Sequence, residues 1–88
     1  MITSIVLIRA QKSRIAETMQ ELAAMDGVSE AYSVTGQYDL VAIVRVPDLM
    51  NLSDFVTQRM LKCEGIIETN TLLAFRAYSK YELEHIFT

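Results

Sequence analysis

The chain has 88 residues, of which 51% are hydrophobic, and a formal net charge of −3. A chain of this length forms one small domain, so we expect a single domain over 1–88, with a core over about 2–77 and a tail over 78–88. The basic residues are spread among acidic ones and form no stripe of the kind that binds nucleic acid. Direct contact with DNA or RNA is therefore not expected.

The chain has no feature of an exported or membrane protein. Its one cysteine, Cys63, cannot form an intramolecular disulfide. The N-terminal apolar run ends at Arg9 and follows no basic segment, unlike a secretory signal peptide. No stretch approaches the roughly 20 apolar residues that span a bilayer. We expect a cytoplasmic protein with no membrane partner.

The first part of the chain reads as a strand followed by a helix. Residues 2–10 are rich in β-branched and aliphatic side chains, which predict a strand. The apolar period then changes to steps of four and three, which predicts a helix that Ser13 caps and that ends at 26–27. Gly27 is expected to take the left-handed conformation at that end. The apolar stripe of this helix consists of Ile15, Met19 and Leu22.

The remaining elements follow in the same way. Strands are expected over 28–35 and 40–46, paired as an antiparallel hairpin about a turn at 36–39. A second helix is expected over 49–62 and a last strand over 66–77. The apolar stripe predicted for the second helix consists of Leu49, Leu52, Val56, Met60 and Cys63, with Phe55 beside it.

The order strand, helix, strand, strand, helix, strand is typical of ferredoxin-like folds. We therefore expect an α+β βαββαβ sandwich: a four-stranded antiparallel sheet with the first and third strands central and two helices on one face. Both faces of the central strands are apolar. In the first strand Ile2, Val6 and Ile8 lie on one face and Ile5 and Leu7 on the other. In the third strand Leu40, Ala42, Val44 and Val46 alternate with Val41 and Ile43.

Two helices cover only one face of such a sheet, and monomers rarely expose a large apolar patch. The open face is therefore expected to pack on the sheet of a second copy about a two-fold axis, which gives a dimeric α/β barrel. The alternative is that the tail, 78–88, folds over this face.

The residue combinations of an enzyme site are missing. The one histidine, His85, lies near the C-terminus, and Cys63 lies on an apolar helix stripe with no histidine near it in sequence. The three glycines are isolated, so there is no phosphate-binding loop. No pair of His, Cys or acidic residues has metal-ligand spacing. We expect no enzyme activity, no cofactor and no metal site.

The segment 34–40, Val-Thr-Gly-Gln-Tyr-Asp-Leu, stands out. One interpretation is structural: Gly36 supplies a positive φ in the turn, and Asp39 binds local backbone. The wider stretch 30–40 also resembles the hallmark of the effector-binding domain of Lrp/AsnC transcriptional regulators, the RAM domain (regulation of amino-acid metabolism). The resemblance covers about 2–75 and continues through Leu52, Phe55 and Val56 and through Gly65-Ile66-Ile67-Glu68-Thr69-Asn70-Thr71.

This resemblance implies the βαββαβ fold, a dimer formed through the sheets, and assembly of dimers into an octamer or similar ring. It implies an amino acid or related metabolite bound between dimers, near this loop. Both charged groups of such a ligand need partners once desolvated: Asp39 would accept from the ammonium group, and the backbone near Gly36 and the hydroxyls of Thr69 and Thr71 would meet the carboxylate. Tyr38 would wall the site. Asp39 alternatively ties down its own loop, and the threonines alternatively only favour the strand. Carried over by motif, the candidate ligand-binding residues are Val34, Thr35, Gly36, Tyr38, Asp39, Thr69 and Thr71.

The chain departs from the full-length regulators, which carry an N-terminal helix-turn-helix domain, because it opens directly into the first strand. It resembles the stand-alone RAM proteins. We expect an amino-acid-sensing and oligomerisation domain that modulates transcription without DNA contact, with full-length Lrp/AsnC regulators as candidate partners. The alternative function is a dimeric α+β barrel enzyme of the small monooxygenase or isomerase type, which the apolar helix stripes disfavour. An RNA-binding sheet is set aside because the central strands carry no aromatic residues.

Overall fold

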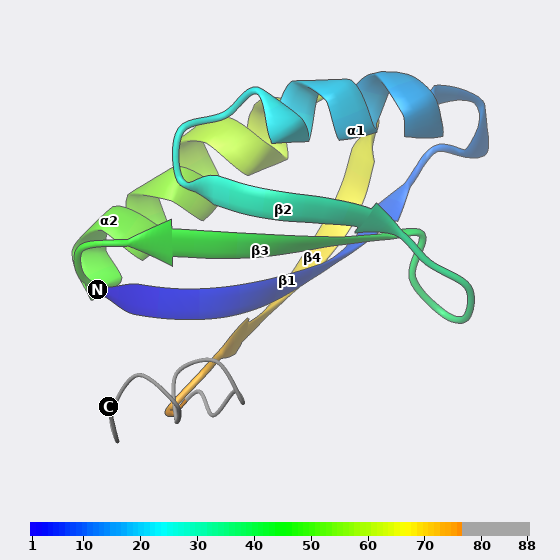
Figure 1. Ribbon diagram of the computed structural model, residues 1–88. Coiled ribbons are helices and arrows are strands. Elements are labelled where there is room, and N and C mark those ends of the chain that lie inside the picture. The colour runs from blue at the N-terminus through cyan, green and yellow to red at the C-terminus, as the bar shows by residue number, and fades with distance from the viewer. Residues whose placement is uncertain (77–88) are drawn as a thin grey trace.

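The structure, a computed structural model, describes residues 1–76. Four strands and two main helical stretches follow one another in the predicted order (Figure 1). The predicted tail, 78–88, lies outside the described residues. The elements are β1 (Ile2–Ala10), η1 (Lys12–Arg14), α1 (Ile15–Ala23), β2 (Val28–Ser33), β3 (Leu40–Val46), α2 (Leu49–Asp54), η2 (Phe55–Arg59), η3 (Met60–Lys62) and β4 (Ile66–Leu73).

The four strands form one antiparallel sheet in the order β2-β3-β1-β4, with the helices on one side of it (Figure 1). The predicted fold and the central positions of the first and third strands are thus confirmed. Two predicted strands were too long: β2 ends at Ser33 rather than residue 35, and β4 ends at Leu73 rather than residue 77.

The predicted start of the first helix is wrong. The chain leaves β1 through the 3₁₀ turn η1, in which Arg14 N–H donates to Gln11 C=O at 2.9 Å. Arg14 therefore occupies the cap position of α1, and no side chain caps this helix. Ser13 lies inside the 3₁₀ turn, where its hydroxyl is not placed to bond the first amides of α1.

The end of the first helix follows the prediction in part. Gly27 has the expected positive φ, 101°, but α1 ends at Ala23, so this glycine shapes the turn into β2 rather than the helix end. A Cβ atom at Gly27 would lie 3.3 Å from Cε2 of Phe55. The bare backbone at this turn therefore packs directly against an aromatic ring of the second helical stretch.

The second helical stretch covers 49–62 as predicted but changes its winding along the way, from α to π to 3₁₀. Asp48 caps its start, since its carboxylate accepts from Asn51 N–H at 2.9 Å. The π-helical segment η2 begins at Phe55. Phe55 is buried, whereas Leu49, which was expected on the apolar stripe, is 57% exposed.

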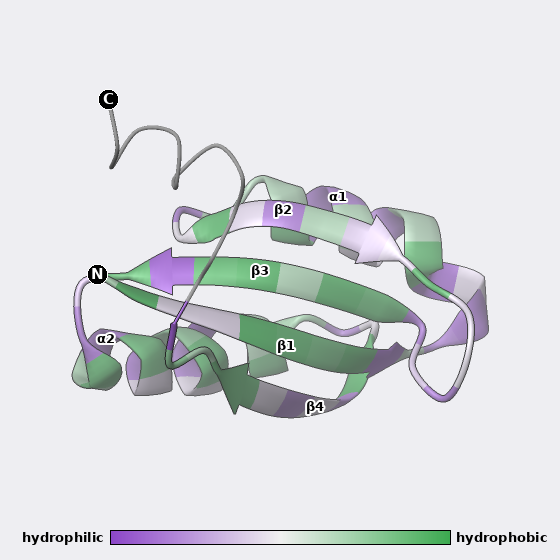
Figure 2. Ribbon diagram, turned by 60° about the horizontal axis from the view of Figure 1, so that its bottom comes forward, coloured by the Kyte–Doolittle hydropathy of each residue, from purple (hydrophilic) through white to green (hydrophobic). Residues whose placement is uncertain are grey.

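The core lies between the sheet and the helices. Its fully buried side chains come mainly from alternate positions of β1 and β3, as the period-two pattern predicted. The opposite positions of the same strands are also apolar and form the open face of the sheet, where Figure 2 shows hydrophobic residues along β1 and β3. Buried core residues include Val6, Ile8, Leu22, Leu40, Ala42, Val44 and Met60, and the open face carries Ile5, Leu7, Val41 and Ile43.

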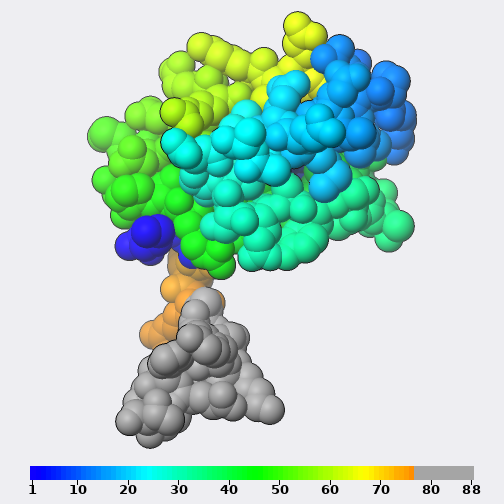
Figure 3. All heavy atoms as spheres, turned by 45° about the horizontal axis from the view of Figure 1, so that its top comes forward, coloured from blue at the N-terminus to red at the C-terminus, as the bar shows by residue number. Residues whose placement is uncertain are grey.

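α1 packs closely on the turn before β4, and this contact can be tested by substitution. Both elements lie in the upper layer of the space-filling view (Figure 3). A Cβ atom at Gly65 would lie 2.1 Å from Oγ1 of the buried Thr18. We expect Gly65→Ala to lower the free energy of unfolding by about 1–3 kcal/mol, measured by urea denaturation at fixed protein concentration. Adding Thr18→Ala should remove part of the clash, so the two effects should not add. Additive losses would contradict this contact.

Candidate functional site

The segment 34–39 connects β2 to β3 at one end of the sheet (Figure 1). Val34 N–H donates to Asp39 C=O at 3.0 Å, which closes the loop. Gly36 has a φ of 112°, a conformation that favours glycine, so the structural interpretation of this glycine is confirmed. Val34, Thr35 and Gly36 are exposed at the tip of the loop.

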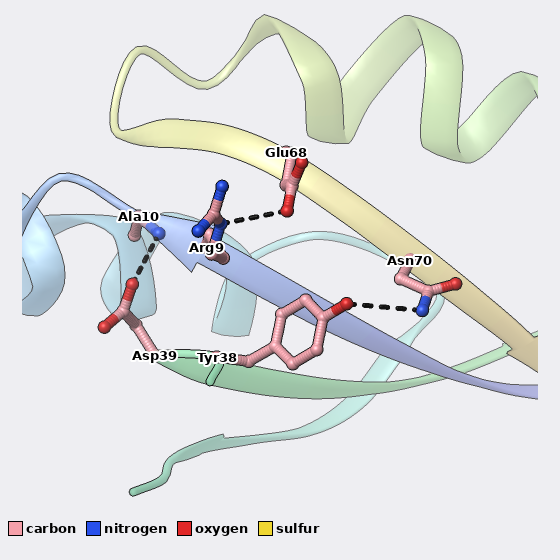
Figure 4. Close-up of polar contacts among 6 residues, drawn as sticks. All are labelled: Arg9, Ala10, Tyr38, Asp39, Glu68 and Asn70. Carbon is pink, nitrogen blue, oxygen red and sulfur yellow. Dashed lines mark hydrogen bonds and ion pairs between the residues drawn. The ribbon is translucent and has the colours of Figure 1, made fainter. Parts of the chain in front are cut away.

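Asp39 fastens this loop to the end of β1. Its Oδ2 accepts from Ala10 N–H at 2.9 Å (Figure 4), and its Oδ1 pairs with Lys12 Nζ at 2.6 Å. Its own N–H donates to Ile8 C=O at 2.9 Å. The Lys12 ammonium and the Ala10 N–H hold the pKa of this carboxyl below its usual range. Asp39 thus ties down its own loop, as the structural alternative expected.

Tyr38 lies over the sheet and reaches β4. Its hydroxyl accepts from Nδ2 of Asn70 at 3.3 Å (Figure 4). Asn70 pairs across the sheet with Leu7, which belongs to the open face. Beside this pair, Arg9 Nε contacts Glu68 Oε1 at 2.9 Å. Tyr38 therefore lies at the border of the open face, with polar residues of β1 and β4 around it.

The two predicted threonines lie on the other face of the sheet. Thr69 pairs with Ile8 and Thr71 with Val6, and both partners face the helices. Successive residues of a strand point to opposite faces, so Thr69 and Thr71 point away from the face that carries Asn70. Within one chain, the seven predicted site residues fall into two groups: the five of the loop, and the two threonines.

A hollow of about 330 Å³ lies where the loop meets the ends of β1 and β4. Its lining has charges of both signs, amide groups and one apolar side chain, and its ion pairs are partly exposed. Exposed ion pairs are weak, so a ligand with a carboxylate and an ammonium can compete for them. The hollow is lined by Arg9, Ala10, Gln11, Lys12, Gln37, Asp39 and Ile67.

Sequence reasoning missed Arg9, Lys12, Gln37 and Asn70 as site residues. The motif places Gln37 in the loop, and strand alternation separates Asn70 from the threonines on either side of it. The other two join the site only through the pairing of β1 with β3 and β4, which no local pattern reveals.

Other chemical groups add no reactive centre to the described part of the chain. Cys63 is buried, and burial raises the pKa of its thiol to about 11, so it remains a neutral thiol near pH 7. Its interpretation as a small buried apolar residue is confirmed. Residues 1–76 contain no group of three or more His, Cys, Asp or Glu residues placed to hold a metal ion.

The sequence profile of the Lrp/AsnC ligand binding domain matches residues 3–83. The chain belongs to this family. An uncharacterized HTH-type transcriptional regulator of Pyrococcus abyssi is 33% identical over 70 residues, which make up 80% of this chain and 44% of that protein. HTH-type transcriptional regulator Ptr1 of Methanocaldococcus jannaschii is 27% identical over 66 residues, or 75% of this chain and 45% of that one.

The chain spans about half the length of the curated relatives it matches. It matches some solved structures over their full length. TTHA0845 from Thermus thermophilus is 51% identical with a TM-score of 0.85, over 91% of this chain and 100% of that one. FFRP-DM1 is 36% identical with a TM-score of 0.82, over 85% and 100%. AsnC of E. coli, 21% identical with a TM-score of 0.82 over 86% and 52%, shares the fold.

The family match supports a regulatory, effector-binding role, since these relatives are transcriptional regulators rather than enzymes. None of the helices formed by residues 1–76 is long and apolar enough to cross a membrane.

The Asp39 contacts predict a pH dependence. The pKa of Asp39 is lowered from 3.8 in this Lrp/AsnC domain, so its ionised form stabilises the fold above that pH. This contribution is lost as the pH falls through the lowered pKa. We expect Asp39→Asn to reduce the loss of unfolding free energy between pH 5 and pH 2, measured by urea denaturation. A variant whose pH profile in this range equals that of the wild type would contradict the assignment.

Proposed function

We propose that this domain binds a small effector next to the 34–39 loop, assembles through its open sheet face, and modulates transcription by coupling the two. The observation that carries the proposal is the position of Tyr38. Its ring borders the face on which a partner would pack, and the neighbouring Asp39 lines the hollow. A ligand in the hollow would thus lie beside the surface on which a second subunit packs.

The open face has the composition of a pairing surface. One row of cross-strand neighbours runs Tyr32, Val41, Leu7, Asn70, and the next runs Glu30, Ile43, Ile5, Leu72. The centre of both rows is aliphatic, and three of the four ends are polar or carry a hydroxyl, as in an interface with an apolar core and a polar rim. Such a self-complementary patch pairs most simply about a two-fold axis.

An acidic substitution at the centre of this face tests the pairing. Ile5→Asp places a charge where the partner sheet would bury it, so we expect the mass in solution, measured by light scattering, to fall to that of one chain. The control is Met50→Asp, which makes the same kind of change at a side chain of α2 that is 75% exposed. A wild type that is already monomeric, or an Ile5→Asp variant that keeps the wild-type mass, would contradict the proposal.

The proposed effector is an amino acid or a related metabolite. The lining of the hollow offers basic groups for a carboxylate and Asp39 for an ammonium group. A fold neighbour, the transcriptional regulator NMB0573 from Neisseria meningitidis, has been solved in complex with L-Met. It is 14% identical to this chain, so it indicates only which class of ligand to try first.

The proposed contacts come from two subunits. Val34, Thr35, Gly36, Tyr38 and Asp39 form the loop side of the site. Thr69 and Thr71 point to the other face of β4, and we assign their hydroxyls to the ligand of a neighbouring dimer. This arrangement places the ligand between dimers, so a ring such as an octamer would be the ligand-bound assembly.

Calorimetry and light scattering with each of the twenty amino acids test the effector. At least one should bind and change the mass of the assembly, because a ligand shifts assembly only when it favours one oligomer. Tyr38→Phe, which removes the contact with Asn70, should weaken binding severalfold. Thr57→Val is the control, since it removes an exposed hydroxyl of the second helical stretch, on the other side of the sheet from the open face. Failure of all twenty to bind would contradict amino-acid sensing.

The final part of the proposal concerns transcription. The domain would act on full-length Lrp/AsnC regulators through their matching domains, without contacting DNA itself. The acidic balance of the chain supports this division, since DNA binding depends mainly on basic residues that contact phosphates.

A further inference from the structure

A second hollow lies at the opposite end of the sheet from the 34–39 loop. It has a volume of about 370 Å³ and lies where the turn from α1 to β2, the end of β3 and the second helical stretch meet (Figure 1). β3 separates the two ends, and its seven residues span roughly 20 Å. We call it the far groove. It is lined by Asp26, Gly27, Arg45, Val46, Pro47, Asn51, Asp54, Phe55, Gln58 and Arg59.

The floor of the far groove is apolar and well packed. Phe55 and Val46 are 6% and 7% exposed. Gly27 lies against the Phe55 ring, close enough that a Cβ atom would be 3.3 Å from Cε2. Val46 is the second nearest side chain, at 3.5 Å from the same point. A firm apolar floor under polar walls is the usual construction of a small-molecule site.

The charged side chains of the far groove are unengaged, in contrast to those at the loop. Arg9, Lys12 and Arg14 all form ion pairs. Within residues 1–76, the side chain of Arg59 forms no ion pair or hydrogen bond, although it lines the far groove. Arg45 also borders the groove, but strand alternation directs its side chain to the open face, as it does that of Ile43. A guanidinium group is planar and binds a carboxylate through two parallel hydrogen bonds.

The acidic side chains of the far groove select the class of ligand. Asp26 and Asp54 also line it, and neither pairs with another residue in the described part of the chain. The far groove therefore offers one guanidinium group, that of Arg59, and two carboxylates. A simple anion would be repelled by the carboxylates, whereas a zwitterion meets both kinds of group.

The winding of the second helical stretch also supports a ligand site at the far groove. Phe55–Arg59 is the π-helical segment η2, and it supplies Phe55, Gln58 and Arg59 to the far groove. A π turn within a helix is rare and is found frequently at functional sites. Here it joins the buried ring of the floor to an unengaged guanidinium group of the wall.

We propose that the far groove is a second ligand site, which binds a zwitterionic α-amino acid separately from the site at the 34–39 loop. Its carboxylate binds Arg59, its ammonium group binds Asp26 or Asp54, and its side chain lies over Phe55. The domain would then hold two effector sites at opposite ends of one sheet, each within reach of a different set of neighbouring subunits.

Amide chemical shifts of the ¹⁵N-labelled full chain, titrated with each of the twenty amino acids, test this site. We expect at least one to cause saturable shifts at 26–27, 45–47 and 51–59. Arg59→Gln should weaken that binding about tenfold or more, as loss of a charge-assisted contact does. Lys62→Gln is the control, since it removes a positive charge from the same helical stretch outside the far groove.

The same titration tests the two proposed sites independently. Shifts confined to 34–39 and its neighbours would overturn the far-groove site and leave the proposed function standing. Shifts confined to the far groove would support the second site and overturn the loop site. Arg59→Gln binding as tightly as Lys62→Gln would overturn the assigned contacts, and no shifts with any amino acid would overturn both sites.

Discussion

The structure depends on one imbalance: the sheet has two apolar faces, and the helices formed by residues 1–76 cover only one of them. On the covered face, alternate residues of β1 and β3 pack against Leu22 and Met60 and are almost completely buried. On the other face, Ile5 and Leu7 remain partly exposed. The same alternation that builds the core therefore builds a second apolar surface, of the kind that monomers rarely expose.

The 34–39 loop lies at the edge of the open face, next to the hollow. Asp39 holds the loop against the end of β1 through Ala10 and Lys12, and Tyr38 is thereby laid at the edge of the open face, in contact with Asn70. One short segment consequently borders both the hollow and the pairing surface. In the proposed function, coupling between ligand and assembly would therefore need no long pathway, because this one loop would contact both.

The sequence predicted the fold well because period-two alternation and strand order are strong signals in this chain. It failed where winding depends on tertiary contacts. Leu49, which its spacing placed on the apolar stripe, is exposed in the first turn of α2, and the 3₁₀ turn at η1 displaced Ser13 from the cap. The loop motif was readable, but Arg9, Lys12 and Asn70 reach it only through strand pairing. The far groove had no sequence signal, since its lining comes from three distant segments.

The most direct test of the account is to detect methyl contacts between subunits. A sample that mixes isotopically labelled and unlabelled chains allows NMR to select contacts that cross from one copy to another. The account predicts such contacts between the methyl groups of Ile5, Leu7, Val41 and Ile43 and those of a second copy. Open-face methyl groups that contact only their own chain, in a protein with the mass of a monomer, would contradict it.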